Sequence, residues 1–72
     1  MKPTQVTNSI RALRFAHGEM TQAELARRID VTRQTVIAIE QGRYSPSLEM
    51  AFRIAHVFGI RLDDVFAYPE EG

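Results

Sequence analysis

Residues 21–41 read TQAELARRIDVTRQTVIAIEQ, and this stretch contains two helix starts. Thr21 and Glu24 match a capping box, in which the hydroxyl accepts a hydrogen bond from the third helical N–H and the glutamate reaches back to the cap. Thr32 can cap a second helix in the same way. Asp30 falls in the tight turn between them, where aspartate tolerates a left-handed backbone conformation better than most residues. The stretch therefore predicts two short helices joined by a tight turn.

Apolar residues within this stretch recur at helical spacing. They give each helix one inward stripe, and the two stripes consist of Leu25, Ala26 and Ile29 and of Val36 and Ile39. A helix with a single apolar stripe packs that stripe on a core and leaves its other face to solvent or to a partner. Two helices of this length, joined by so short a turn, have the dimensions of a helix-turn-helix.

The outward face of the second helix carries Gln34, Ile37, Ala38 and Gln41, which lie opposite its apolar stripe. No acidic residue lies on that face, although a merely solvated helix face usually carries Glu and Lys. Amide, small and apolar side chains instead suit base edges, because glutamine can bond adenine in two places and Ile or Ala can contact the thymine methyl group. Arg33 flanks the face, within reach of a guanine or a phosphate. The pattern predicts a helix that reads bases in the major groove of DNA.

Three further helices are predicted outside this stretch. The first runs from a cap at Thr7 or Asn8 to about His17, and Gly18 supplies the stop. Its shared face consists of Ile10, Leu13 and Arg14. The segments Thr4 to Val6 and Ala67 to Tyr68 are candidates for extended backbone, and they predict a small sheet that joins the two ends of the chain.

The next helix begins at residues 46–47 and ends at Gly59. Its inward face is predicted to consist of Leu48, Ala51, Phe52, Ala55 and Phe58. A second apolar stripe, about a third of a turn away, consists of Met50, Ile54 and Val57. The last helix and the tail span residues 62–72, and this helix is predicted to bury Val65 and Phe66. The acidic residues at its start complement the positive end of the helix dipole.

Length and composition limit the remaining possibilities. The chain has 72 residues, so residues 1–72 are predicted to form a single helix-turn-helix domain with its motif at about residues 21–41. There are no cysteines, which excludes disulfides, thiolate zinc sites and cysteine nucleophiles, and which fits a reducing compartment. The longest uninterrupted aliphatic run, Val36–Ile39, is far too short to cross a membrane. We therefore expect a cytoplasmic protein with no membrane partner.

The charges of the chain are balanced in number but unevenly distributed. Nine basic and nine acidic residues give a net charge of zero. Residues 1–62 hold all nine Lys and Arg with only five acids, whereas four acids lie in the last ten residues. The bulk of the domain is thus mildly basic, which fits a nucleic-acid partner and equally an ordinary solvated surface. Charge alone does not decide between the two.

No set of residues predicts a metal site, a cofactor or a reaction. His17 and His56 are each solitary in the sequence. The carboxylates of Asp63 and Asp64 point in different directions around a helix start, which fits capping rather than a catalytic pair. The glycines are scattered, and they form no phosphate-binding loop. We expect a protein that is not an enzyme and that needs no cofactor or metal.

Taken together, six segments of the chain resemble the Xre-like, phage-repressor-type helix-turn-helix regulators, especially their compact single-domain members. These segments follow the family order with nearly the family spacing, and they are Ile10 to Arg14, Thr21 to Ala26, Val31 to Val36, Ile39 to Tyr44, Pro46 to Glu49 and, last, Gly59 and Ile60 with Leu62 to Phe66. The resemblance implies an all-α, five-helix DNA-binding domain. It also implies double-stranded DNA as the partner and, commonly, a homodimer that acts as a transcriptional repressor or regulator.

The resemblance assigns roles to individual positions. It places in the major groove Arg33, Gln34, Ile37 and Ala38. It gives capping or DNA-backbone contacts to Thr32 and Thr35, and phosphate contacts to Gln22, Arg43 and Tyr44. Gln22 is alternatively an ordinary capping residue, and Ile37 is alternatively a solitary exposed apolar residue, which is normal on any surface.

The resemblance also implies that Arg14 and Glu40 pair between the first and third helices and so orient the recognition helix. The alternative is a solvated ion pair worth about 0–1 kcal/mol. The chain departs from the family pattern in several places. Residues 18–20 make the loop after the first helix one residue longer than usual, Asp30 replaces the usual glycine, and Ala38 is shorter than the polar residue that some members use. Sequence specificity therefore cannot be copied from a relative.

The second stripe of the long helix has two interpretations. With two aromatic residues near the chain end it forms either plain core or the self-complementary patch of a twofold dimer, and the set consists of Met50, Ile54, Val57, Phe66 and Tyr68. We favour the dimer, because a small chain gains buried surface by dimerising and two recognition helices about 34 Å apart meet successive major-groove turns of a palindrome. An alternative function is an antitoxin-like protein-interaction module with secondary or lost DNA binding.

Overall fold

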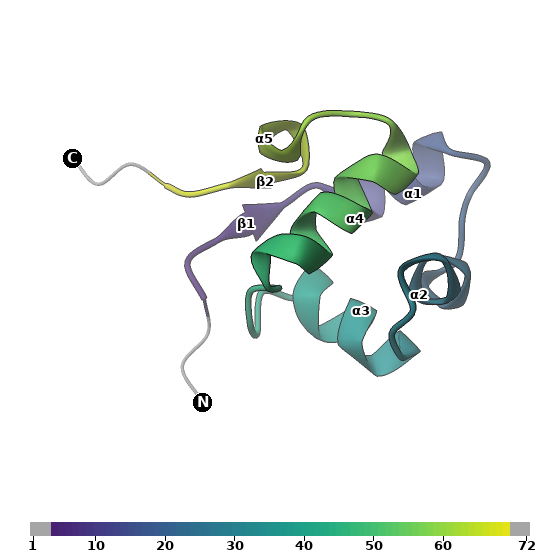
Figure 1. The fold of residues 1–72 in the computed structure, drawn as a ribbon, viewed down its shortest axis with the longest axis horizontal. Helices are drawn as coiled ribbons and strands as arrows, with labels where there is room; N and C mark the ends of the chain where they lie inside the picture. The colour runs from purple at the N-terminus through teal and green to yellow at the C-terminus, as the bar shows by residue number, and fades with distance from the viewer. Residues whose placement is uncertain (1–3, 70–72) are drawn as a thin grey trace.

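Helix α4 crosses the middle of the molecule, and the other helices are arranged around it (Figure 1). The computed structural model describes residues 4–69. In chain order the elements are β1 (Thr7–Asn8), α1 (Ile10–Ala16), α2 (Gln22–Ile29), α3 (Arg33–Glu40), α4 (Leu48–Phe58), α5 (Leu62–Val65) and β2 (Phe66–Ala67). Five helices and a small sheet confirm the predicted architecture. The acidic pair Glu70 and Glu71 of the predicted tail lies outside the described residues.

The two strands pair the ends of the chain, as predicted, but at shifted positions. They are antiparallel, with Thr7 opposite Ala67 and Asn8 opposite Phe66. The predicted partner segment, residues 4–6, is not part of the sheet. There the Val6 N–H donates to the Thr4 hydroxyl at 3.1 Å, a local bond of the kind that competes with a sheet ladder.

Helix α1 begins at Ile10, later than the predicted caps. Its N-cap position, Ser9, makes no side-chain capping bond. The side chain of Asn8 supplies the acceptor instead, because its Oδ1 takes the Ile10 N–H at 3.1 Å. The helix ends in the extended loop, where Gly18 (φ 74°) and Glu19 (φ 57°) are both left-handed.

The core lies between α1, α2, α3, α4 and α5. The inward stripes predicted for residues 21–41 are confirmed, because all five of their residues are buried. Further large apolar side chains of the core come from the other helices, and they are Ile10, Ile54, Phe58 and Val65, while Met20 is buried from the loop between α1 and α2. None of the helices within residues 4–69 has the length and apolar character that a membrane span requires.

The predicted inward face of α4 is partly wrong. Leu48 and Phe52 are 67% and 54% exposed, whereas Ile54 is 1% exposed and belongs to the core. The buried face consists of Ala51, Ile54, Ala55 and Phe58. These positions share one side of the helix, and Leu48 and Phe52 lie on its flank. Ile54 is therefore unavailable to a dimer partner.

The remaining residues of the predicted dimer patch are less deeply placed. Met50, Val57 and Phe66 are partly buried against the core, and Tyr68 is 66% exposed. The stripe that contains Met50, Ile54 and Val57 is thus core rather than surface at its centre. Any partner surface on this part of the molecule must be built from its more exposed neighbours.

The capping box of α2 is only half formed. The Glu24 N–H donates to the Thr21 hydroxyl at 3.0 Å, as predicted. The Glu24 carboxylate does not return to the cap, because it accepts hydrogen bonds from Arg27 and Arg28 one turn along the helix. A carboxylate bonds more strongly to a guanidinium than to a neutral amide. The reciprocal bond predicted for Glu24 is therefore wrong.

Candidate nucleic-acid interface

Helix α3 starts from a well-defined turn and cap. Asp30 ends α2 in the left-handed conformation (φ 63°), which confirms that aspartate keeps the turn in place of glycine. The Thr32 hydroxyl then accepts the Thr35 N–H at 3.2 Å, and the two threonine hydroxyls lie 3.0 Å apart. The capping role of Thr32 is thereby confirmed. The start of α3 is fixed relative to the end of α2.

Gln34, Ile37 and Ala38 share the face of α3 opposite its buried residues, and Arg33 flanks that face. Arg33 and Gln34 are exposed, and Ile37 and Ala38 are half-buried. Within residues 4–69 neither the Arg33 nor the Gln34 side chain has a hydrogen-bond partner, and Arg33 has no ion-pair partner. Two polar side chains next to two small apolar patches therefore remain available to a ligand.

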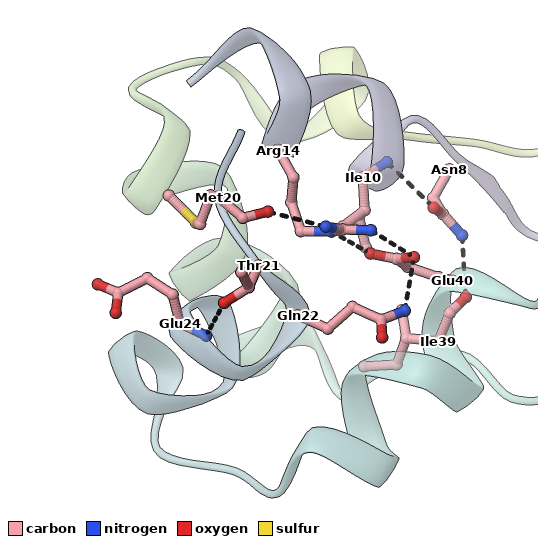
Figure 2. A network of polar contacts seen from close by, with 9 residues as sticks. All are labelled: Asn8, Ile10, Arg14, Met20, Thr21, Gln22, Glu24, Ile39 and Glu40. Atoms are coloured by element: carbon pink, nitrogen blue, oxygen red, sulfur yellow. Dashed lines mark hydrogen bonds and ion pairs between the residues drawn. The ribbon is translucent and has the colours of Figure 1, made fainter. Parts of the chain in front are cut away.

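A buried ion pair holds α3 against α1 (Figure 2). The Arg14 Nε lies 2.6 Å from Glu40 Oε2, and a second guanidinium nitrogen donates to Oε1 at 3.2 Å. The third nitrogen donates to the Met20 carbonyl at 2.8 Å. The two side chains are only 9% and 8% exposed. The pairing implied by the resemblance is confirmed, and the alternative of a solvated ion pair is wrong.

Gln22 joins this network from the first turn of α2. Its Nε2 donates to Glu40 Oε1 at 3.2 Å, so the carboxylate is bonded from both α1 and α2. The side chain is half-buried. The backbone N–H of Gln22 is in the first turn of α2, where amide hydrogens have no intrahelical acceptor. Gln22 therefore helps to orient α3 through Glu40, and its backbone N–H has no acceptor within the helix.

Asn8 makes a second contact that holds α3, a role that was not predicted from the sequence. Its Nδ2 donates to the Ile39 carbonyl at 2.9 Å, while its Oδ1 accepts from the start of α1 (Figure 2). One side chain thus links the sheet, α1 and the last turn of α3. The only signal in the sequence was an asparagine just before a helix, which predicts a cap but not a partner 31 residues away.

The residues predicted to contact phosphate beyond α3 have different environments. The chain leaves the helix through Gly42, which is left-handed (φ 71°), and the Arg43 N–H donates to the Ala38 carbonyl at 3.0 Å. The Arg43 residue is exposed, whereas Tyr44 is partly buried against the core. Arg43 is thus free to reach a ligand beside α3, and Tyr44 has a packing role as well.

A concave surface runs between α1, the start of α2 and α3. We call it the α1–α3 groove, and its lining residues are Asn8, Ser9, Arg11, Ala12, Arg14, Phe15, Thr21, Gln22, Ala23, Arg33, Glu40 and Gln41. Glu40 is the only acidic residue among them, and its carboxylate is already bonded to Arg14 and Gln22. The groove therefore borders the recognition face with an excess of positive charge.

His17 has a structural environment. Its ring meets the Phe58 ring edge-on at a centroid distance of 5.1 Å, and its Nδ1 lies 2.9 Å from the Leu13 carbonyl. These contacts close the end of α1 over the core. Within residues 4–69, no three potential ligand side chains gather in a way that could hold a metal ion.

Comparison with known proteins gives independent evidence for the family to which the chain belongs. Residues 10–65 match the family model described as Helix-turn-helix. The uncharacterized HTH-type transcriptional regulator MJ0272 of Methanocaldococcus jannaschii is 45% identical over 64 residues, which cover 89% of this chain and 96% of that protein. The uncharacterized HTH-type transcriptional regulator YgzD of Bacillus subtilis is 44% identical over 64 residues, with coverage of 89% and 96%.

Two solved structures share the fold. The hypothetical transcription factor NHTF from Neisseria gives a TM-score of 0.72 at 28% identity, over 83% of this chain and 68% of that chain. A transcriptional regulator from Listeria innocua gives a TM-score of 0.70 at 21% identity, over 92% of this chain and 64% of that chain. At this level of identity the second likeness concerns the fold alone.

Two short helices joined by a tight turn, packed against three further helices, are the arrangement of the class of helix-turn-helix DNA-binding domains. The chain belongs to the helix-turn-helix family of transcriptional regulators. The predicted resemblance is therefore confirmed. Membership of a family of DNA-binding regulators also confirms the interpretation that the chain is not an enzyme.

Proposed function

We propose that the protein is a homodimeric transcriptional repressor that places α3 in the major groove of a palindromic operator in the cytoplasm. The observation that carries this proposal is the acid-free outer face of α3, held in one orientation by the buried pair of Arg14 and Glu40. A helix that reads bases must keep its side chains in register with base edges. The buried pair supplies that rigidity.

The exposed positions of α3 suit two kinds of contact. In the proposed complex Gln34 bonds an adenine edge, and Ile37 and Ala38 contact thymine methyl groups. Arg33 bonds either a guanine or a phosphate. Phosphate and backbone contacts then come from Gln22, Thr32, Thr35, Arg43 and Tyr44. Phosphate contacts set the position of the domain on the duplex, and base contacts set its sequence preference.

The exposed apolar flank of α4 supports a dimer. Leu48 and Phe52 lie one turn apart on that flank. Each lines a shallow apolar depression, and Leu62 lines both depressions. Phe66 lines one of these depressions. We propose that these four residues, extended by the exposed Tyr68, form the twofold interface. This surface lies beside the originally predicted patch and replaces the buried Ile54.

The proposal is tested by selection from a pool of random duplexes. The purified protein is titrated into the pool at about 50 and 200 mM salt, and the bound fraction is sequenced. A palindromic consensus with half-sites about ten base pairs apart, and binding that weakens steeply with salt, supports the proposal. Bound DNA without any consensus contradicts base reading by α3.

The exposed flank of α4 also favours a second candidate function, an antitoxin-like interaction module. Leu48 and Phe52 are more exposed than large apolar side chains usually are, and a partner protein would cover them as well as a second copy would. The two functions differ in one observable. A stoichiometric protein partner lost on substitution of Leu48 or Phe52, together with no duplex binding at low salt, supports the module.

A further inference from the structure

We propose that the α1–α3 groove seats the sugar-phosphate backbone of duplex DNA and that Arg11 is a phosphate contact from α1. This inference rests on the proposed function and adds a contact that neither the sequence pattern nor the resemblance assigned. It extends the binding surface from the helix-turn-helix motif to the first helix. The occupant is one strand of the duplex whose bases α3 contacts.

Charge is the first argument. Arg11, Arg14 and Arg33 line the groove, and Glu40 is its only acid. The charge of Glu40 is matched by Arg14, to which it is bound at 2.6 Å. Within residues 4–69 no acidic group lies within ion-pair distance of Arg11 or Arg33. Two guanidinium groups, one from α1 and one from α3, are thus left uncompensated on the same concave surface.

The side chain of Arg11 is also held in place. Its guanidinium carbon lies 5.7 Å from the centroid of the Phe15 ring, one turn further along α1. Phe15 is 53% exposed, and its ring also lies 5.7 Å from the Arg14 guanidinium carbon. Contact with an aromatic face attracts a cation and limits its conformations. The exposed phenyl group therefore acts as a platform that keeps Arg11 at the rim of the groove.

The position of the groove identifies the anion. It runs beside α3, and Arg33 belongs both to its lining and to the edge of the recognition face. A duplex with its major groove on α3 must carry a phosphate strand along that edge. Further side chains that line the groove can donate hydrogen bonds to phosphate oxygens, and these are Ser9, Thr21, Gln22 and Gln41. A strand of phosphates fits this concave surface, which carries polar donors and uncompensated positive charge.

The test compares two variants, each of which loses the positive charge of one exposed arginine. Arg11→Gln removes the proposed contact, and Arg61→Gln is the matched control, because Arg61 lies outside the groove at the start of α5. Fluorescence anisotropy measures the affinity of each variant for the selected operator and for a scrambled duplex across a salt series. We expect Arg11→Gln to weaken binding to both duplexes by about three- to tenfold. The salt slope, which is the steepness with which the logarithm of the binding constant falls with the logarithm of salt concentration, is expected to decrease by about one. Arg61→Gln is expected to leave the slope unchanged.

Four outcomes show how this inference and the proposed function fail separately or together. An Arg11→Gln slope equal to that of the wild type overturns the phosphate contact, as does a loss confined to the operator. If the wild type shows no preference for the operator, the proposed function fails, but the slope on the scrambled duplex still decides the role of Arg11. Absence of any duplex binding by the wild type at low salt overturns both.

The Phe15 platform has a separate readout. Phe15→Leu keeps every charge of the groove but removes the aromatic face beneath Arg11. We expect about a twofold loss of affinity on both duplexes with an unchanged salt slope, because the number of phosphates neutralised stays the same. A Phe15→Leu variant that binds like the wild type overturns the platform role. Thermal unfolding followed by circular dichroism verifies that each variant is folded.

Discussion

Arg14 and Glu40 are the residues on which the orientation of the recognition helix depends most directly. Their buried pair connects α1 to α3, and the Met20 carbonyl and the Gln22 amide complete its hydrogen bonds. Within residues 4–69 no buried side-chain polar atom lacks a partner. Glu40→Ala leaves the Arg14 charge buried without its counter-ion. We therefore expect the free energy of unfolding in urea to fall by about 3–5 kcal/mol.

Two further variants check the origin of that loss. Glu40→Gln retains an acceptor and is expected to lose less than Glu40→Ala. Glu49→Ala removes an exposed ion pair, in which the Glu49 side chain is 78% exposed and the Arg53 side chain is 50% exposed. Such pairs contribute about 0–1 kcal/mol to the free energy of unfolding. Similar losses for Glu40→Ala and Glu49→Ala would show that burial of the first pair has no energetic consequence.

Gln34 and Arg43 separate base contacts from phosphate contacts. We expect Gln34→Ala to lose about 1–3 kcal/mol of binding free energy on the selected operator and little on random DNA. Arg43→Ala is expected to weaken binding to the operator and to random DNA alike and to lower the salt slope by about one. Anisotropy titrations on the two duplexes measure these losses. Equal losses on both DNAs for Gln34→Ala are incompatible with base reading by that residue.

At the scale of the element, the surface of α2 contains a carboxylate whose ionisation contributes to folding. Hydrogen bonds from Arg27 and then Arg28 hold the pKa of the Glu24 carboxyl below its ordinary value of 4.5. Because the folded-state pKa is depressed, the carboxylate stabilises the fold above the unfolded-state pKa. That contribution is lost as the pH falls through the folded-state pKa.

The Glu24→Gln variant tests this dependence. We expect it to be less stable than the wild type at neutral pH and the difference to disappear in acid, once the wild-type carboxyl is protonated in both states. Urea midpoints measured for both proteins from neutral to acid pH give the comparison. A difference that grows as the pH falls has the opposite sign and refutes the assignment.

The last turn of α3 is tied to the chain ends by Asn8. Asn8→Ala removes its bonds to the Ile10 N–H and the Ile39 carbonyl, and we expect a loss of about 1–3 kcal/mol in stability. Backbone amides at the end of α3 are expected to exchange faster with solvent. Thr7→Ala is the control, because it removes only an exposed 3.3 Å bond to the Ala67 carbonyl. Unchanged exchange in α3 would show that Asn8 does not hold this helix.

Local signals in the sequence predicted α2 and α3 well. Thr21, Thr32 and Asp30 each act within a few residues, and the structure confirms all three. The start of α1 was harder to predict, because Asn8, whose Oδ1 accepts from the Ile10 N–H, also donates through its Nδ2 to the carbonyl of Ile39, which is distant in the sequence. Side-chain bonds across such separations have no periodic signature in the chain.

The buried face of α4 could not be chosen from the sequence. Eight of its eleven residues are apolar, and two overlapping stripes satisfy helical spacing almost equally. Which stripe is buried depends on where α2 and α5 contact the helix. The recognition face of α3 was easier to predict from the sequence, because only one side of that helix is apolar enough for the core. Which bases it contacts depends on DNA and stays a prediction.

At the scale of the whole molecule, α4 and the joined chain ends leave one apolar flank exposed. We expect the wild type to sediment as a dimer at micromolar concentration. Leu48→Ser with Phe52→Ser is expected to sediment as a folded monomer, because both side chains are exposed and neither supports the core. Phe15→Ser removes a similarly exposed aromatic from α1 and is expected to stay dimeric. A double variant that sediments like the wild type places the interface elsewhere.

Contact between the outer face of α3 and DNA underlies the proposed function. The most direct measurement is the change in backbone amide chemical shifts of the labelled protein on adding the selected operator duplex. We expect the largest changes to cluster at residues 33–43, at the start of α2 and around Arg11 in α1. Changes concentrated instead around Leu48 and Phe52, with α3 unperturbed, would contradict it.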